Sequence, residues 1–190
     1  MNQLLAWLKG GTLQSDGFAE QAADFVIQHP ELLDDLLEGL ESSDNVVRGR
    51  AADALERVAR VRPLPFVEHL PRLASLARRD PVPMVRWHLA MLFADLIEHK
   101  PAAHEIFKAL SILLYDPSAF VTSWAISGLC ILGRRYPARR PAIVWQLGSL
   151  GEDRSAAVRN RVGKALRLLL NDQLPLPKGW VKSPSLRESL

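Results

Sequence analysis

The sequence predicts an all-α protein whose antiparallel helix pairs follow one another as repeats. The dipeptide Val47-Arg48 recurs as Val85-Arg86, Val121-Thr122 and Val158-Arg159, at spacings of 38, 36 and 37 residues. Apolar residues stand three, seven and ten positions after each dipeptide, which is the pattern of a helix with one buried face. No segment alternates between apolar and polar residues with period two, so no strand is expected. A fixed period of this length is typical of a solenoid.

The recurring dipeptides align four equivalent positions at their second residue, namely Arg48, Arg86, Thr122 and Arg159. The second helix of each pair is expected to start four residues before this position. Asp44, Ser118 and Ser155 stand there in three repeats, and each can cap a helix by accepting a hydrogen bond from an unpaired backbone N–H. The remaining repeat has Val82, which is followed by Pro83 at the first helical position, where a missing N–H costs nothing.

The first helices are expected over 31–41, 65–78, 102–114 and 139–150, and a proline opens each unit. The repeats therefore cover about 30–62, 63–100, 101–136 and 137–171. An irregular N-terminal pair, with helices over 2–9 and 16–28, completes a single domain of residues 1–171. Asp80, Asp116 and Asp153 lie in the turns between paired helices, where the first repeat has Ser42.

Residues 172–190 are punctuated by Pro175 and Pro177 and cannot form another repeat. Two interpretations stay open. The segment caps the last helix through Leu174, Leu176 and Trp180, because end repeats need a cover, or it is a mobile terminus.

The repeats resemble the HEAT-repeat family. Residues 47–55 carry its second-helix pattern, Val-Arg-x-x-Ala-x-x-Ala-Leu, after an apolar first helix, with an Asp in the turn of the later units. The resemblance implies a right-handed αα superhelix of the HEAT/armadillo type. It also implies a structural role for Arg48, Arg86 and Arg159, which would pair with turn aspartates between repeats. Thr122 and Ser42 depart from the family pattern, so that ladder is expected to be interrupted.

In this family the second helices line the concave side of the superhelix. At 100° per residue, Trp87 and Met91 face away from the core at the centre of that side. A Trp beside a Met, framed by Arg, has the composition of a binding hot spot. The alternative is that neighbouring helices or the tail cover Trp87 and Trp124. The other expected binding residues are His88, Trp124, Ser127, Arg50, Arg57, Arg161, Lys164 and Arg167. Trp145, on a first helix, is expected in the core.

The net charge of +3 conceals an asymmetry, because residues 1–45 carry −8 and residues 46–190 carry +11. An acidic end and a basic end make head-to-tail self-association a further hypothesis. The single cysteine, Cys130, excludes an intramolecular disulfide and favours a reducing, cytoplasmic setting. It has no activating neighbour in the sequence and is expected to be inert.

No motif for catalysis, nucleotide binding or metal binding appears, so no cofactor, metal site or catalytic residue is predicted. His104-Glu105 lacks the second His that a metalloprotease helix needs. No apolar run approaches the roughly 18 residues of a membrane span.

The primary hypothesis is a non-enzymatic scaffold that binds a protein or peptide of acidic and apolar character.

The alternative hypothesis is nucleic-acid binding. Some HEAT-like proteins are similar to DNA-alkylation glycosylases, which carry Trp, Asp and Arg on the concave face. Trp87, Trp124, Asp95 and Arg161 occupy that region here. The cations of the last second helix are suited to phosphate contacts, whereas the acidic N-terminal segment would repel DNA.

Overall fold

The computed structural model describes residues 3–150 and 155–189, and every regular element within them is a helix. The longer helices are α2 (Ala19–Gln28), α4 (Asn45–Val61), α5 (Leu70–Arg79), α6 (Pro83–Asp95), α7 (Ala103–Leu113), α8 (Ala119–Arg135), α9 (Arg140–Gly148) and α10 (Ala156–Leu170). Three short helices, α1 (Gln3–Trp7), α3 (Leu33–Glu38) and α11 (Pro184–Glu188), complete the α-helical set in these residues. A single isolated bridge, between Lys178 and Val181, is the only β-type pairing in the described part of the chain.

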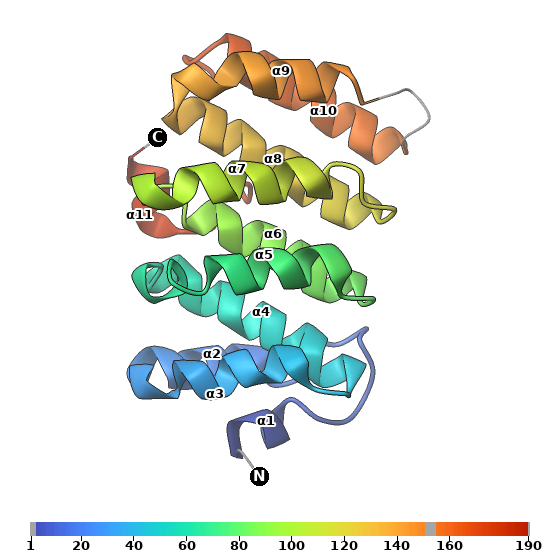
Figure 1. Ribbon diagram of the computed structural model, residues 1–190, viewed down its shortest axis with the longest axis vertical. Coiled ribbons are helices and arrows are strands. Elements are labelled where there is room, and N and C mark those ends of the chain that lie inside the picture. Colours follow the sequence, from blue (N-terminus) through green and yellow to red (C-terminus); the bar gives the residue numbers. More distant parts are fainter. Residues whose placement is uncertain (1–2, 151–154, 190) are drawn as a thin grey trace.

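The helices form two layers that are stacked in sequence order (Figure 1). One layer contains the first helices α3, α5, α7 and α9, and the other contains α2 and the second helices α4, α6, α8 and α10. Each second helix packs against the next one, and each second helix also contacts the first helix of its own pair. The predicted all-α class and the sequential pairing of helices are therefore confirmed.

The second helices begin where the sequence places them, and two of the three predicted polar caps form. Asp44 Oδ1 accepts a hydrogen bond of 2.8 Å from the Val46 amide, and Ser155 Oγ accepts one of 3.3 Å from the Val158 amide. The cap predicted at Ser118 is wrong, because its side chain makes no capping hydrogen bond. Instead, the Ser118 amide donates to Asp116 Oδ1 over 2.7 Å. Val82 precedes α6, with Pro83 at its first position as expected.

Arginine–aspartate pairs link consecutive repeats at two junctions. Arg48 Nε lies 3.1 Å from Asp80 Oδ2, and Arg86 binds Asp116 through two hydrogen bonds of 2.7 and 2.9 Å. Each arginine also donates to the carbonyl six residues before it, and Thr122 does the same with the Asp116 carbonyl. The three positions are thus equivalent in the repeat. At the third junction Thr122 stands in place of the arginine, as the sequence shows, and the turn residue Asp153 lies outside the described residues.

The N-terminal pair is shorter than the sequence pattern predicts. Helix α2 begins at Ala19, three residues after the expected start, because Gly17 adopts φ +55° and cannot belong to a right-handed helix. Leu4 and Leu8 from the first segment and Ala22 and Val26 from α2 join the common core.

Helices α6 and α8 are buried on all sides. Residues 84–97 of α6 and its following turn are all buried except Trp87, and residues 125–133 of α8 are all buried. A helix that is apolar around its whole circumference needs a cover on both faces. The first helices cover one face, so another part of the chain must cover the other.

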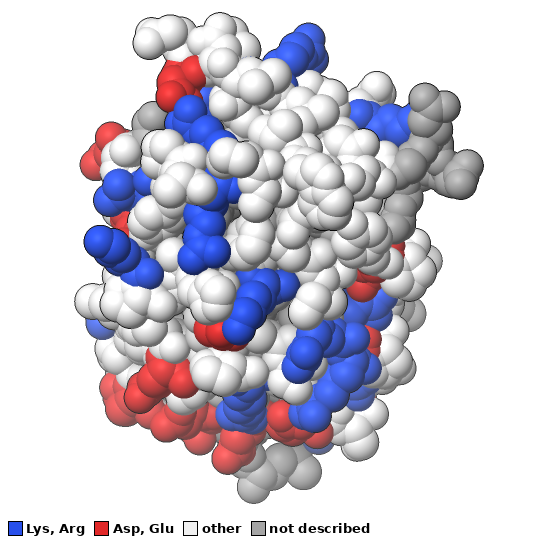
Figure 2. All heavy atoms as spheres, turned by 45° about the horizontal axis from the view of Figure 1, so that its top comes forward, with Lys and Arg blue, Asp and Glu red and all other residues white. Residues whose placement is uncertain are grey.

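The charges are distributed unevenly over the folded molecule. Figure 2 shows the acidic side chains gathered at the end that contains α2 and α3, while Lys and Arg are spread over the rest of the visible face. The asymmetry in the sequence is therefore also an asymmetry in space. Head-to-tail association through these ends stays a prediction.

Candidate functional site

The C-terminal segment, residues 172–189, turns back after α10 and lies on the second helices. We call the surface of α4, α6, α8 and α10 that is turned away from the first helices the second-helix face. Trp180, Val181, Ser183 and Leu186 are buried on it, with exposed fractions of 7%, 4%, 1% and 0%. The interpretation as a mobile terminus is wrong for these residues. The alternative, a cap, is right in that the segment packs back, but its contacts run from α10 to α4 rather than ending at the last helix.

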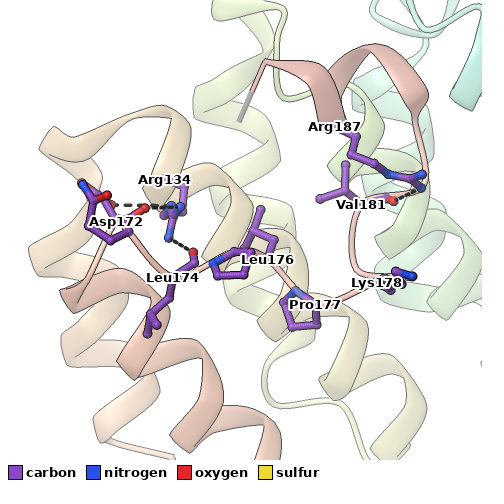
Figure 3. Close-up of a pocket in the computed structure, with 11 residues that line it drawn as sticks. Arg134, Asp172, Leu174, Leu176, Pro177, Lys178, Val181 and Arg187 are labelled. Atoms are coloured by element: carbon purple, nitrogen blue, oxygen red, sulfur yellow. Dashed lines mark hydrogen bonds and ion pairs between the residues drawn. The ribbon is translucent and has the colours of Figure 1, made fainter.

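Arg134 of α8 fixes the start of the C-terminal segment (Figure 3). Its Nη1 donates to the carbonyls of Asn171 and Leu174 over 3.3 and 3.0 Å, and its Nη2 donates to the carbonyl of Asp172 over 2.8 Å. The same Nη1 donates to the Leu168 carbonyl near the end of α10, where carbonyls lack intrahelical donors. One guanidinium therefore joins the end of α10 to the segment through four backbone carbonyls, and its Nε also lies 3.5 Å from the Asp172 carboxylate.

Arg161 of α10 contacts two indole rings. Its guanidinium carbon lies 5.1 Å from the ring centre of Trp180 and 5.4 Å from that of Trp124. Its Nη1 donates to Ser127 Oγ over 2.6 Å, which holds the side chain in this orientation. A cation against the faces of aromatic rings is attractive, and the attraction grows where water is excluded. Arg161 and Trp124 therefore form a subsite for the Trp180 ring.

Two acidic side chains are buried beneath the segment. Glu56 of α4 is fully buried and accepts two hydrogen bonds from Arg60, one of them 2.8 Å long. Asp95 at the end of α6 is 3% exposed and accepts a hydrogen bond of 3.1 Å from the Ser183 amide through Oδ1. Its second oxygen, Oδ2, is buried and has no hydrogen-bond partner among the described residues.

The environment of these carboxyl groups disfavours their charge. Burial raises the pKa of Asp95 well above its usual range, and the nearby Glu56 raises it further. The Ser183 amide and the charges of Arg60 and Lys182 act in the opposite direction. Burial also raises the pKa of Glu56, against the hydrogen bond and the charge of Arg60. The ammonium of Lys182 lies 5.5 Å from the Trp124 ring centre, and its charge lowers the pKa of both acids.

The end of the segment is held by local hydrogen bonds and by a buried leucine. Ser183 caps the start of α11, because its Oγ accepts a hydrogen bond from the Leu186 amide. Arg187 donates a hydrogen bond of 2.9 Å to the Val181 carbonyl (Figure 3). Leu186 is fully buried, and α11 contacts α4. An open cavity of about 670 Å³ lies between the start of the segment and α11, with Arg134, Lys178 and Arg187 among its lining residues.

The central residues of the predicted binding face are mostly covered. His88 and Met91 are buried with exposed fractions of 9% and 7%, Ser127 is fully buried, and Trp87 is half-buried beside Phe120. Trp124 and Arg161 are half-buried and contact the C-terminal segment. The expected open position of Met91 is therefore wrong, because its side chain is buried, and Trp87 is partly covered beside Phe120. The alternative that these helices or the tail cover Trp87 and Trp124 describes the structure better.

His88 is a neutral side chain inside the α6 region. Burial is the main reason that its pKa falls from 6.5 to about 4, so the imidazole is uncharged near neutral pH. Its Nδ1 donates to the Met84 carbonyl over 2.9 Å, and its Nε2 accepts from Trp87 Nε1 over 3.3 Å. The separation of 3.6 Å between Nε2 and Asp53 is therefore not an ion pair at that pH.

The cations that were expected to bind a partner differ in their exposure. Arg50 is buried, and its guanidinium donates to the carbonyls of Leu8, Lys9, Gly10, Thr12 and Ser15. Arg50 was expected among the binding residues of the concave face, but it is buried and holds the N-terminal loop onto α4. Arg57 is partly exposed and pairs with Asp53 over 2.9 Å, with Asp16 and Glu20 nearby. Lys164 and Arg167 are exposed on α10.

Trp145 is not a core residue. Its side chain is 71% exposed on α9, which corrects the expectation from its apolar sequence neighbours. The neighbouring positions Ile143 and Leu147 are the ones that enter the core. An offset of two residues rotates a helical side chain by about 200°, so a Trp amid apolar residues can lie on the outer surface.

Sequence reasoning named Asp95 only for the nucleic-acid alternative and did not pair it with Glu56, and it missed Lys182, Ser183 and Leu186 altogether. One signal was present in the sequence. Residues 83–95 contain only two charged side chains, Arg86 and Asp95, which indicates a helix without a solvent-facing side.

No group of three or more potential metal ligands occurs in residues 3–150 and 155–189. Cys130 is buried, and burial raises the pKa of its thiol to about 12. No helix of this part of the chain is long and apolar enough to cross a membrane.

The chain matches no protein-family model, and no curated protein matches it. The functional argument therefore rests on the second-helix face and the segment that lies on it.

Proposed function

We propose that this protein is a HEAT-like solenoid, a right-handed αα superhelix, that acts as a non-catalytic scaffold and binds an extended segment of a partner protein on its second-helix face. Solenoids of stacked helix pairs present long surfaces suited to such binding. The resemblance to HEAT repeats is supported by the equivalent positions of Arg48 and Arg86, which pair with Asp80 and Asp116. In this view the C-terminal segment is a ligand that belongs to the same chain.

One observation carries the proposal: the helices bind the backbone of the C-terminal segment with their side chains. Arg134 donates to the carbonyls of Asp172 and Leu174, and Asp95 accepts from the amide of Ser183. Main-chain hydrogen bonds of this kind give affinity for an extended chain, while pockets for individual side chains give specificity. The Trp180 subsite and the buried position of Leu186 supply such pockets.

A peptide library tests this function without assuming a sequence for the partner. The full-length chain with Lys182→Glu, which weakens its own segment, is panned against displayed random peptides. We expect enrichment of peptides that a free peptide of residues 175–189 displaces. The matched control is the chain with Lys108→Glu, a charge reversal at an exposed lysine remote from the segment in sequence. Failure to enrich any displaceable peptide would argue against the proposal.

Nucleic acid is the second candidate, because Lys164 and Arg167 are exposed on α10. The resemblance to alkylation glycosylases gains little support, since Asp95 is covered by the segment. A gel shift with duplex DNA at low salt tests this candidate, because phosphate binding is strongest there. Binding that falls with salt and with Lys164→Ala and Arg167→Ala together would favour nucleic acid over the scaffold.

A further inference from the structure

We infer that the partner segment carries an aromatic residue two positions before a lysine or arginine, the arrangement of Trp180 and Lys182, and competes with the C-terminal segment for the second-helix face. This inference rests on the proposed function and specifies the chemistry of the partner. It is argued from the three subsites that the segment occupies: one for an aromatic ring, one for a cation and one for a backbone amide.

The aromatic subsite is formed by side chains of α8 and α10. Arg161 is oriented by Ser127 and by the Ser123 carbonyl, and it presents its guanidinium to the ring of Trp180. Trp124 contacts the same guanidinium from α8. A flat, electron-rich ring matches this subsite, and the 7% exposure of Trp180 shows how completely it is enclosed. An aliphatic side chain in its place would lose the cation–π attraction.

The cation subsite is formed by the Trp124 ring and the two buried acids. The ammonium of Lys182 lies 5.5 Å from the centre of that ring, and its charge lowers the pKa of both Glu56 and Asp95. These carboxyl groups repel each other in a place with little water, and Asp95 Oδ2 has no donor within the described residues. A positive side chain relieves the repulsion, whereas a negative one would increase it.

The backbone subsite fixes the register between the other two. Asp95 accepts from the amide of Ser183, the residue that follows Lys182. Trp180 closes a tight turn in which its amide donates to the Pro177 carbonyl over 3.1 Å, and Lys182 follows two residues later. Trp180 and Lys182 both reach the pair formed by Arg161 and Trp124. A partner needs the same spacing to use both subsites with one backbone.

Attachment to the same chain makes the segment a strong competitor. A ligand joined by a short linker acts at an effective concentration in the millimolar range. A partner in solution therefore binds the native protein weakly unless its own affinity is high or the C-terminal segment is weakened. This competition predicts that variants of the segment increase binding of a free peptide.

The test uses a fluorescein-labelled peptide of residues 175–189 and fluorescence anisotropy with the full-length protein. We expect the chain with Lys182→Glu to bind the peptide at least tenfold more tightly than the native chain. Peptides with Trp180→Ala or Lys182→Glu should bind that chain at least tenfold more weakly, and a peptide with Glu188→Gln, at an exposed position, should bind unchanged. A chain with Leu186→Ala provides a second weakened host if the first is unstable.

The outcomes separate this inference from the function on which it rests. Enriched library peptides that compete with the segment but lack an aromatic residue two positions before a cation would overturn the inference and leave the scaffold function standing. Equal binding of the native and the Lys182→Glu peptides would also overturn it. Dimers formed by exchange of C-terminal segments, detected by light scattering, would assign the face to a second copy of this chain instead.

Discussion

The amide of Ser183 donates a hydrogen bond of 3.1 Å to Asp95 Oδ1, although 88 residues separate the two in sequence. This contact joins the C-terminal segment to the centre of the helical stack. The segment is therefore part of the folded domain.

Substitution of two tryptophans tests how much the docked C-terminal segment contributes to the stability of the fold. Trp180 is 7% exposed, whereas Trp145 is 71% exposed. We expect Trp180→Ala to cost about 3 kcal/mol, the usual range for a buried aromatic residue, and to accelerate amide exchange over residues 176–188. Trp145→Ala should change the free energy of unfolding by less than about 0.5 kcal/mol. Hydrogen exchange and urea unfolding check both values. Equal effects of the two substitutions would mean that the segment is not docked in solution.

The buried pair of Arg86 and Asp116 should matter far more than a surface pair. The Arg86 and Asp116 side chains are 9% and 7% exposed, and removing one partner leaves the other charge buried. We expect Arg86→Ala to lower the free energy of unfolding by about 3–5 kcal/mol. Lys108→Ala, which removes an exposed pair with Glu105, should cost no more than about 0.5 kcal/mol. Urea unfolding of both variants measures the two changes in the free energy of unfolding. A small loss of unfolding free energy for Arg86→Ala would show that this junction between repeats contributes little to stability.

Arg50 should control the order of the N-terminal loop. Its guanidinium donates to five backbone carbonyls between Leu8 and Ser15. We expect Arg50→Lys to lower the free energy of unfolding by about 2 kcal/mol, because an ammonium cannot reproduce the fork of donors and carbonyls are left unpaired. Amide exchange should rise over residues 8–17. Arg62→Lys, at an exposed position, is the control, and an equal effect at both sites would contradict the assigned role.

Two helical glycines should respond in opposite directions to the same substitution. A Cβ atom at Gly133 of α8 would lie 2.6 Å from Leu169 Cδ2 and 3.2 Å from Ile143 Cδ1, and both neighbours are buried. We expect Gly133→Ala to destabilise the protein by about 1–3 kcal/mol. A Cβ atom at Gly163 of α10 meets nothing within 4 Å, so Gly163→Ala should stabilise it by about 0.5–1 kcal/mol. Thermal unfolding of the two variants gives the signs, and a stabilising Gly133→Ala would exclude the close packing of α8 against α9 and α10.

His88 should make stability depend on pH in a defined window. Its pKa is about 4 in the folded protein, mainly through burial, against 6.5 in the unfolded chain. The unfolded state therefore gains a proton first as pH falls. The stabilisation is complete above pH 6.5 and is lost as pH falls toward 4, by at most about 1.4 kcal/mol per pH unit.

His88→Gln removes this titration and keeps a donor and an acceptor at the site. The carboxyl groups of Asp95 and Glu56, whose raised pKa values act with the opposite sign, are present in both proteins and cancel in the difference. We expect the native chain to lose more stability than His88→Gln between pH 7 and pH 5, as measured by urea unfolding. Parallel curves for the two proteins would show that His88 is accessible to protons in the folded state.

The sequence by itself determined the repeat register and the starts of the second helices. Asp44, Val82, Ser118 and Ser155 stand directly before α4, α6, α8 and α10. Periodicity, capping and proline effects act within about four residues, so they can be read from local sequence. The pairing of Arg48 and Arg86 with turn aspartates followed from the resemblance, because repeats place equivalent residues at equivalent contacts.

Only the tertiary structure decided what covers the second-helix face. Nothing in residues 172–190 shows that Trp180 meets Arg161, that Ser183 meets Asp95, or that Lys182 lies near Glu56. The same is true of Arg50, which looked like a surface cation and instead binds the loop of residues 8–15. Such contacts depend on the fit between segments far apart in the chain, and the free energy of that fit is not encoded in the pattern of either segment alone.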